Sequence, residues 1–435
     1  MARGKKAAAT LTPEEKLQQA LVPVEEQPYE IPENWCYIPQ QVICQLSNGE
    51  KMDDKQYPYL EVKYLRGNKD AEIVNSGKFI PAYSRVILVD GENSGEVFTV
   101  LEDGYMGSTF KALEISQAVL PEYLQYFIST KKELYRNNKK GSAIPHLNKD
   151  MFFTTAFPLA PLAEQQRIVD CVESIFAKLN EAKEKVQAVV DGFELRKSAI
   201  LHKAFTGELT TQWRQEHGVG LESWNTAFYC DLGTSKLGKM LDKAKNTGIE
   251  TPYLRNINVR WFSFDLSDIA NMLATDEERE SLSVKKGDLF ICEGGEPGRC
   301  AIWKDDDSNL IFQKALHRFR PNEKVLSEFL CYNLYYMSLS DELEKYFTGT
   351  TIKHLTGKSL AQIQIKIPTI CEQSEIIRIL EQVFEKEEQA QEAAETVIDQ
   401  IDTMKKAVLA RAFRGELGTN DPTEESAVEL LKALL

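Results

Sequence analysis

The sequence predicts an α+β protein made of two strand-rich domains and two long helices with coiled-coil seams, arranged as an internal tandem repeat with pseudo-two-fold symmetry. Three observations lead to this prediction: a gapless repeat of a helical segment, a heptad-like apolar pattern in both copies, and short β-branched runs elsewhere. The length agrees, because 435 residues are too many for one ordinary core and suit two to four domains. The composition, with 43% hydrophobic and 27% charged residues, is that of a soluble globular protein.

The repeat relates residues 164–209 to residues 372–417 without a gap. Identical residues include the opening Glu-Gln pair and the closing Phe-x-Gly-Glu-Leu run. The same offset relates GSAIPHL at 141–147 to GTTIKHL at 349–355. Looser matches lie upstream, and they pair PYLEVKYLRG at 58 with PYLRNINVR at 252, FKAL at 110–113 with QKAL at 313–316, and Trp35 with Trp224. We interpret the chain as a tandem duplication of a variable domain followed by a near-constant helical segment.

Each copy of the constant segment predicts one long amphipathic helix. Its apolar residues step by four and three, from Ile168 to Ile200 and from Ile376 to Val408, with Arg196 and Glu387 as polar seam positions. About 40 residues would extend roughly 60 Å, and neither helix can bury its stripe alone. We therefore expect the two helices to pack on each other.

The variable segments predict short strands with one helical stretch each. SRVILVD at 84–90 and GDLFICEGGEPGRCAIW at 287–303 are β-branched and bounded by turn residues, and helices are expected at 121–136 and 326–347. The Gly-rich run at 293–299 predicts a hairpin loop. The predicted segments are an N-terminal helical segment (1–30), a first variable domain (31–157), a central helical region (158–210), a second variable domain (221–367), a second helical region (368–418) and a C-terminal helical tail (419–435).

The pattern of reactive side chains argues against an enzyme. The eight cysteines show no C-x-x-C and no zinc-ligand spacing with histidine, and no nucleophile, methyl-donor or phosphate-binding motif is complete. GKS at 357–359 lacks the preceding glycine of a phosphate-binding loop and predicts a turn. His146 and His354 occupy matched positions, and we expect them to be buried turn residues. No window is apolar enough for a membrane span, and we expect an intracellular protein.

The charge is unevenly distributed. The formal net charge is −14, and residues 368–435 alone contain 7 Lys and Arg against 15 Asp and Glu. An acidic chain taken as a whole argues against nucleic-acid binding, since phosphate contacts need concentrated Lys and Arg. The two variable domains are nearly neutral, which leaves such a role open to them.

These motifs together resemble a known family. PLAPLAEQQRIV before the first coil, RKSAILHKAFTGELT at 197–211 and its echo KKAVLARAFRGEL are similar to the DNA-specificity subunit of type I restriction-modification systems, called HsdS. The second variable domain resembles it through PYLRNINV, GDLFICEGGEPGR, QKALHRFRP and GTTIKHLTGKSL. The first departs from the pattern, because SRVILVDGENSGE replaces the usual Gly-Asp and Gly-x-Pro-Gly form.

The resemblance implies a non-catalytic subunit of a complex that defends a bacterial or archaeal cytoplasm against foreign DNA. Two target-recognition domains, held apart by two antiparallel coiled-coil helices, would each read one half of a bipartite site in double-stranded DNA. The helices would set the spacer and dock two adenine-specific methyltransferase subunits, and ATP-dependent restriction and translocase subunits would join. S-adenosylmethionine, Mg²⁺ and ATP would belong to those partners, so no cofactor, metal or membrane contact is expected of this chain.

Candidate DNA contacts follow from the chemistry of base readout, in which Arg or Lys binds guanine and Asn or Gln binds adenine. In the first domain they are Lys51, Lys55, Lys63, Arg66, Lys69 and Lys78. In the second they are Lys236, Lys239, Lys243, Lys245, Arg255, Asn256, Arg260, Arg299 and Lys314. The alternative for each is a solvated surface charge.

Candidate partner-docking residues come from the repeated closing run, and the alternative there is that the phenylalanines cap the helices. They are Phe205, Gly207, Glu208, Leu209, Phe413, Gly415, Glu416 and Leu417. The chief alternative for the whole chain is a coiled-coil interaction scaffold without DNA binding. That alternative explains the acidic charge but not why the helical segments agree while the paired domains diverge. A second alternative, a fused methyltransferase, lacks the necessary motifs.

Overall fold

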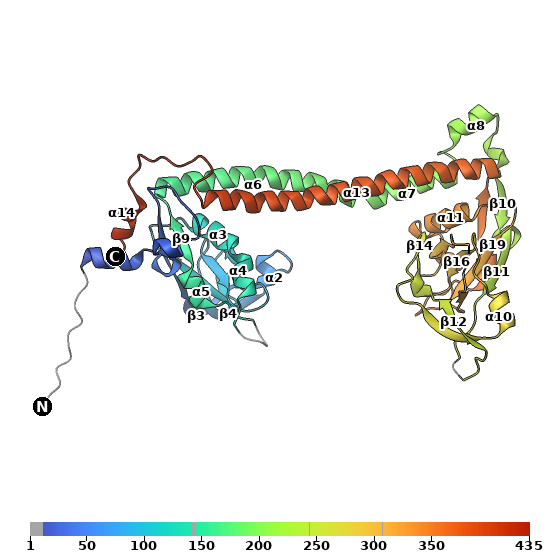
Figure 1. The fold of residues 1–435 in the computed structure, drawn as a ribbon, viewed down its shortest axis with the longest axis horizontal. Helices are drawn as coiled ribbons and strands as arrows, with labels where there is room; N and C mark the ends of the chain where they lie inside the picture. The colour runs from blue at the N-terminus through green and yellow to red at the C-terminus, as the bar shows by residue number, and fades with distance from the viewer. Residues whose placement is uncertain (1–11, 141–144, 243, 307) are drawn as a thin grey trace. The chain divides into compact units, whose positions relative to one another are not determined.

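The computed structural model describes residues 12–140, 145–242, 244–306 and 308–435 (Figure 1). They form two compact units. Unit 1 contains the residues up to Val186 together with Thr396–Leu435, and unit 2 is Gln187–Glu395. Each unit contains one strand-rich domain and parts of the long helices, which confirms the predicted α+β class.

Unit 1 contains nine strands in its described part. The strands are β1 (Cys36–Pro39), β2 (Cys44–Ser47), β3 (Glu50–Leu60), β4 (Ile73–Ile80), β5 (Arg85–Leu88), β6 (Val97–Thr99), β7 (Gly104–Met106), β8 (Phe110–Ile115) and β9 (Ala156–Leu159). Its short helices are α1 (Pro13–Ala20), α2 (Val62–Leu65), α3 (Pro121–Thr130), α4 (Lys132–Asn137), α5 (Lys149–Thr154) and α14 (Ala427–Lys432), with 3₁₀ turns η1 (Val24–Glu26) and η2 (Gln40–Val42). The helix expected at 121–136 is interrupted at Lys131, between α3 and α4.

Unit 2 repeats this inventory with additions. Its strands are β10 (Asn225–Phe228), β11 (Gly233–Leu237), β12 (Ile249–Leu254), β13 (Val259–Arg260), β14 (Ser263–Phe264), β15 (Ala270–Ala274), β16 (Leu289–Cys292), β17 (Cys300–Ile302), β18 (Ile311–Phe312), β19 (Leu316–Pro321) and β20 (Gln364–Ile367). Its short helices are α7 (Phe193–Thr206), α8 (Thr211–His217), α9 (Tyr229–Leu232), α10 (Asp276–Ser281), α11 (Ser327–Leu339) and α12 (Gly357–Ala361), with 3₁₀ turns η3 (Leu221–Ser223), η4 (Asn256–Asn258) and η5 (Glu344–Tyr346).

The two units share their strand order. The main sheet is β2-β8-β5-β6 in unit 1 and β11-β19-β16-β17 in unit 2. The second group is built alike, because β3 pairs antiparallel with β4 and parallel with β7, as β12 pairs antiparallel with β15 and parallel with β18. The outer pairs β1-β9 and β10-β20 are antiparallel in both units. The duplication predicted from the sequence therefore extends to the topology of the variable domains.

Backbone hydrogen bonds fix which residues of the two domains are equivalent. The N–H of Gly107 donates to the carbonyl of Leu60 (3.1 Å), and the N–H of Gln313 donates to that of Leu254 (3.0 Å). The predicted match of residues 58–60 with 252–254 is therefore confirmed. The match of FKAL with QKAL is wrong by three residues, because Gly107 corresponds to Gln313 and Phe110 to Leu316.

The long helices differ in continuity. The first is α6 (Leu162–Asp191) followed by α7, with an irregularity at Gly192, whereas the second, α13 (Ile370–Ala412), is unbroken over 43 residues. At Gly192 the N–H is shared between the carbonyls of Ala188 and Val189, both at 3.2 Å. The expected single helix of the first copy is thus two helices in direct succession. α7 ends at Gly207, whose φ of 84° is the left-handed conformation that glycine adopts without strain.

In each unit the long helices pack antiparallel, as the resemblance implies. In unit 1, Figure 1 shows α6 beside the C-terminal part of α13, and Lys183 Nζ lies 2.8 Å from Asp402 Oδ2. In unit 2, the two polar seam residues of the sequence pattern meet, with Arg196 Nε 3.0 Å from Glu387 Oε2. An ion pair within an apolar seam can fix the register of a coiled coil.

The recurring Glu-Gln pair at the start of each long helix is buried, and both ends of each glutamine amide form hydrogen bonds. Gln165 Oε1 accepts from the N–H of Leu120, where α3 begins (2.9 Å), and its Nε2 donates to the carbonyls of Ala118 and Ala160. Gln373 does the same in unit 2, accepting from the N–H of Leu326 before α11 and donating to two carbonyls. Each glutamine therefore joins a long helix to the helix of its own domain.

The neighbouring glutamates hold a different segment. Glu372 is fully buried, lies 2.7 Å from Arg214 Nη1 and accepts hydrogen bonds from Thr210 Oγ1 (2.7 Å) and Trp224 Nε1 (3.0 Å). In unit 1, Glu164 accepts from Thr419 Oγ1 (2.6 Å) and pairs with Arg167 (2.8 Å). Each carboxylate therefore binds the segment that follows the other long helix: Glu372 binds the segment after α7, and Glu164 binds the segment after α13.

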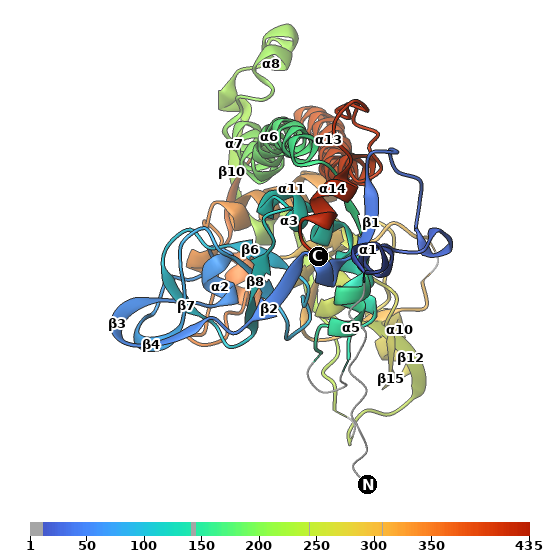
Figure 2. The same ribbon diagram turned by 90° about the vertical axis from the view of Figure 1, so that its left-hand side faces the viewer.

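The terminal helices of unit 1 lie against each other. α1 contacts α14, and Figure 2 shows both near the C-terminus. The N–H of Ala427 donates to the carbonyl of Asn34 (2.9 Å). The chain of unit 1 therefore closes on itself at this point.

We expect Glu372→Ala to lower the free energy of unfolding of unit 2 by about 3–5 kcal/mol, because it leaves the Arg214 guanidinium buried without its carboxylate. Urea denaturation followed by Trp fluorescence measures the change. Glu375→Ala, which removes an ion pair to Arg378, serves as the control and should cost no more than about 1 kcal/mol. Unfolding of Glu372→Ala at the wild-type urea concentration would show that this carboxylate is not an anchor.

Candidate nucleic-acid interface

In both domains the hairpin of the main sheet ends against a histidine-bearing segment. The N–H of Leu147 donates to the carbonyl of Val89 at the end of β5 (2.8 Å), and the N–H of Leu355 donates to that of Glu293 after β16 (2.8 Å). β16 and β17 form the antiparallel hairpin predicted from the Gly-rich run at 293–299. The matched histidines are thus brought to the same place in each domain.

The prediction that His146 and His354 are buried is wrong. Both side chains are exposed, whereas their neighbours Leu147 and Leu355 are buried in the cores. In unit 1, His146 Nδ1 lies 2.6 Å from Asp90 Oδ1. The leucine of each His-Leu pair takes the core position because successive extended residues point to opposite sides.

The second domain has a recess at this hairpin end. A cavity of about 370 Å³ is lined by Asn256, Glu293, Gly294, Gly295, Lys314, Ala315 and His354. Two predicted DNA-contact residues, Asn256 and Lys314, therefore share one site with His354. The amide of Asn256 donates to the Gly294 carbonyl (3.3 Å), and a Cβ at Gly295 would lie only 2.8 Å from the Asn256 amide nitrogen. Gly295 also has a φ of 83°, a left-handed conformation that favours glycine.

Two further predicted residues support the same recess. Arg299 Nη2 donates to the Asn256 carbonyl (3.0 Å) while its Nη1 pairs with Glu296 (2.7 Å). The N–H of Lys314 donates to the Lys239 carbonyl (2.9 Å), and the Lys239 ammonium pairs with Glu278. Arg299 and Lys239 therefore position the recess rather than offer free charges.

The other candidates of the second domain are dispersed. Arg255 pairs with Asp268 (2.8 Å), Arg260 with Asp265 (3.5 Å) and Lys245 with Asp242 (3.7 Å). Lys236 is exposed on β11, and Lys243 lies outside the described residues. These residues do not line the recess.

In the first domain, the candidates lie on β3, β4, α2 and the loop that follows α2. Lys51 and Lys78 are register partners on β3 and β4, and Lys55 is exposed near the irregularity of β3. Lys51 pairs with Asp53 (3.5 Å), Lys69 with Glu61 (2.7 Å) and Arg66 with Glu96. Lys63 is exposed on α2. Only Lys78 turns toward other lysines, because its Nζ lies 3.5 Å from Asn48 Oδ1, the same atom to which Lys111 donates.

Lys111 and Lys149 were not among the predicted residues. Burial, with the nearby ammonium groups of Lys78 and Lys149, lowers the pKa of Lys111 below its usual value, and the Asp90 carboxylate opposes this. Their convergence depends on the pairing of β8 and on α5, which are distant in sequence from β4. No local pattern could have revealed it.

The docking candidates divide into buried and exposed residues. Phe413 packs against Tyr123 and Phe127, and Phe205 packs against Phe329 and Tyr336. Gly207 is buried, Leu209, Gly415 and Leu417 are half-buried, and Glu208 and Glu416 are exposed. In the free chain the two phenylalanines therefore belong to the cores of the domains, and docking stays a prediction.

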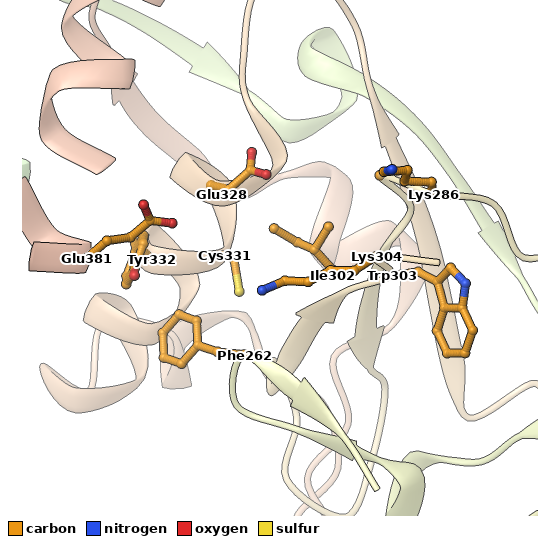
Figure 3. Close-up of a pocket in the computed structure, with 10 residues that line it drawn as sticks. Phe262, Lys286, Ile302, Trp303, Lys304, Glu328, Cys331, Tyr332 and Glu381 are labelled. Carbon is orange, nitrogen blue, oxygen red and sulfur yellow. The ribbon is translucent and has the colours of Figure 1, made fainter. Parts of the chain in front are cut away.

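A second cavity of unit 2 lies away from the hairpin recess. It has about 390 Å³, and Figure 3 shows Phe262, Tyr332 and Cys331 around it, with Glu328 and Glu381 at one side. Cys331 Sγ lies 3.4 Å from Cys300 Sγ, and burial raises the pKa of the Cys300 thiol well above its usual value. A buried thiol with a raised pKa, such as that of Cys300, is a poor nucleophile.

The described residues hold no group of three or more His, Cys, Asp or Glu placed to bind a metal ion. GKS at 357–359 opens the short helix α12, whose N-cap is Thr356, where the sequence predicted a turn. Within the same ranges, every helix is too short or too polar to cross a bilayer.

Comparison with known proteins gives one family. The model of the type I restriction modification DNA specificity domain matches residues 32–190 and again 222–396. The chain is 25% identical over 422 residues to the MjaVIII specificity subunit of Methanocaldococcus jannaschii, covering 89% of this chain and 94% of that protein. It is 24% identical to the EcoKI specificity subunit of Escherichia coli K12, covering 89% and 90%.

Solved structures agree in fold. A chain from a study of complex assembly and conformational transition in a type I restriction-modification system aligns with a TM-score of 0.71 at 18% identity, covering 90% of this chain and all of that one. The HsdS subunit of Thermoanaerobacter tengcongensis aligns with a TM-score of 0.56 at 18% identity, covering 91% of this chain and all of that one.

We expect Phe413→Ala to lower the free energy of unfolding of unit 1 by about 3–5 kcal/mol, because it removes a ring buried among two other rings. Thermal or urea denaturation measures this. Glu416→Ala, three residues away and exposed, is the matched control and should change stability by less than about 0.5 kcal/mol. Equal stability of the two variants would contradict a core role for Phe413.

Proposed function

Because this chain belongs to the type I restriction-modification DNA specificity family, we propose that it is the non-catalytic subunit that chooses the DNA sequence on which a methyltransferase and nuclease complex acts. Each strand-rich domain reads one half of a bipartite site. The long helices set the spacer between the halves and dock two methyltransferase subunits. The observation that carries this proposal is the duplication of the strand-rich domain. The two copies share the strand order of the main sheet but have different residues at the end of its hairpin.

The chemistry of the second domain suits base readout. Asn256 presents an amide that can bind adenine in a bidentate manner, and Lys314 presents an ammonium group that can bind guanine from the same recess. Both lie on loops fixed by backbone hydrogen bonds, so little ordering entropy is lost on binding. Two domains joined in one chain by the long helices also gain from effective concentration, so neither half needs high affinity alone.

The reacting groups belong to the partners in this proposal. We place S-adenosylmethionine, Mg²⁺ and ATP on adenine-specific methyltransferase and ATP-dependent restriction subunits in the cytoplasm of a bacterium or archaeon. The purified chain alone then neither methylates nor cleaves DNA. Glu208 and Glu416, the exposed residues of the repeated closing run, are the docking residues to test first.

Co-expression with candidate methyltransferase subunits, followed by mapping of methylated adenines in genomic DNA, tests the function. We expect one bipartite sequence to be methylated. A stable complex that methylates no defined sequence, with no DNA binding by the chain, would favour the interaction scaffold instead.

Specificity should divide by domain. Exchanging residues 31–157 for those of a related subunit is expected to change one half of the methylated sequence and leave the other intact, because base contacts come from separate modules. Methylation mapping reads the outcome. The reciprocal exchange of residues 221–367 is the control, and an exchange that altered both halves would exclude independent readers.

The spacer should follow helix length. One heptad inserted after Val186 in α6 and one after Glu395 in α13 add about 10 Å to both helices while keeping the seam in phase. The methylated half-sites should stay the same and their spacer should lengthen by at most about three base pairs, at 3.4 Å per base pair. A heptad in α6 alone, which mismatches the seam, is the control and should abolish methylation. An unchanged spacer in the double insertion would show that the helices do not set the distance.

A further inference from the structure

Two lysines of the first domain contact one neutral side chain, and a third lies near them. Lys78 Nζ, from β4, lies 3.5 Å from Asn48 Oδ1, and Lys111, from β8, donates to the same oxygen. Lys149, the first residue of α5, is close enough to lower the pKa of Lys111. Two ammonium groups that share one acceptor atom must lie close to each other.

This cluster differs in its partners from those cations of the domain that are paired with carboxylates. Lys51, Arg66 and Lys69 each face a carboxylate, and so do Lys139 and Lys140. In contrast, no carboxylate in the described part of unit 1 forms an ion pair with Lys78, Lys111 or Lys149. The Asp90 carboxylate, which raises the pKa of Lys111, is engaged by His146 at 2.6 Å. The free chain therefore gathers positive charge here without neutralising it.

We propose that Lys78, Lys111 and Lys149, gathered around Asn48, form a subsite for one phosphodiester group of the DNA backbone. The inference rests on the proposed function and deepens it. Converging cations of this kind repel each other in the free protein, and an anion placed among them relieves that repulsion. The backbone of DNA supplies such an anion whatever the sequence, so these lysines position the duplex and do not read it.

The equivalent place in the second domain is not basic. The backbone correspondence that equates Phe110 with Leu316 places His317 at the position of Lys111, and His317 is fully buried, with Nε2 2.9 Å from the Leu355 carbonyl oxygen. The phosphate subsite is therefore a property of the first domain alone. Its loss should weaken binding without altering the choice of bases in either half-site.

The test measures binding of the full chain, in complex with its methyltransferase subunits, to specific and random duplexes over a range of KCl concentrations. Replacing all three lysines by glutamine should make the plot of log affinity against log salt shallower by about 0.9, the value for one phosphate contact. The change should be the same on both duplexes, and the methylated sequence should be unchanged. Lys432→Gln on α14 is the control, and Lys111→Arg should keep the wild-type slope.

Several outcomes would overturn the proposal. An unchanged slope of log affinity against log salt in the triple variant would exclude a shared phosphate contact. A change near three times 0.9 would also exclude it, because each lysine would then contact its own phosphate. A change in the methylated sequence would show that the lysines contact bases. Stronger competition by inorganic phosphate than by chloride at equal ionic strength, lost in the triple variant, would identify a free-phosphate site. If the wild-type complex itself methylates no defined sequence, the proposed function fails; if it does and the variants match it, only the subsite fails.

Discussion

The buried Glu-Gln pair at the start of each long helix is the interaction on which the rest of the molecule depends. A helix begins with four N–H groups that lack intrahelical partners, and the helices α3 and α11 begin inside the domains. Gln165 and Gln373 supply the acceptor at these two places and satisfy two further carbonyls each. A domain that lost this contact would leave buried polar groups unpaired and would no longer be fixed to its helix.

The glutamates extend the same constraint to the connecting chain. Glu372 and Glu164 are buried, so each requires compensation, and each obtains it from residues that follow the opposite long helix. Burial raises the pKa of Glu164, while Thr419 and Arg167 lower it, which is the balance expected of a carboxylate held by its partners. The near-constant sequence of the helical segments thus reflects polar contacts in addition to an apolar seam.

The sequence predicted those parts of the fold in which packing and buried hydrogen bonds leave few residue types possible at each position. The repeat at 164–209 and 372–417 and the polar seam positions Arg196 and Glu387 could be read from it, and the structure shows that these two residues meet. The displaced match of residues 110–113 shows the limit. Strand pairing constrains only alternate faces, so a four-residue similarity outside the constant segment does not determine register.

The candidate site was less predictable for the same reason. Asn256 and Lys314 were identified by residue type, but their common recess depends on the hairpin between β16 and β17. Most other predicted cations turned out to be paired with carboxylates, which composition cannot reveal. Lys111 was missed because its neighbours come from β4 and α5, and His146 and His354 were judged buried although the adjacent leucines fill the cores.

The distribution of charge follows the division of the chain into the long helices, which form a frame, and the strand-rich domains, which carry the candidate DNA contacts. Five glutamates of α13, at 381, 385, 388, 392 and 395, repeat at steps of four and three and are all exposed, so they form one acidic row on the helix. Such a row repels phosphates and suits a basic protein surface. The domains share strand order but not surface chemistry: Val62 stands where the second domain has Asn256, because Leu60 and Leu254 are equivalent by backbone pairing. A frame that keeps its polar contacts constant lets each hairpin end vary without loss of the fold, and this freedom is what two independent readers require.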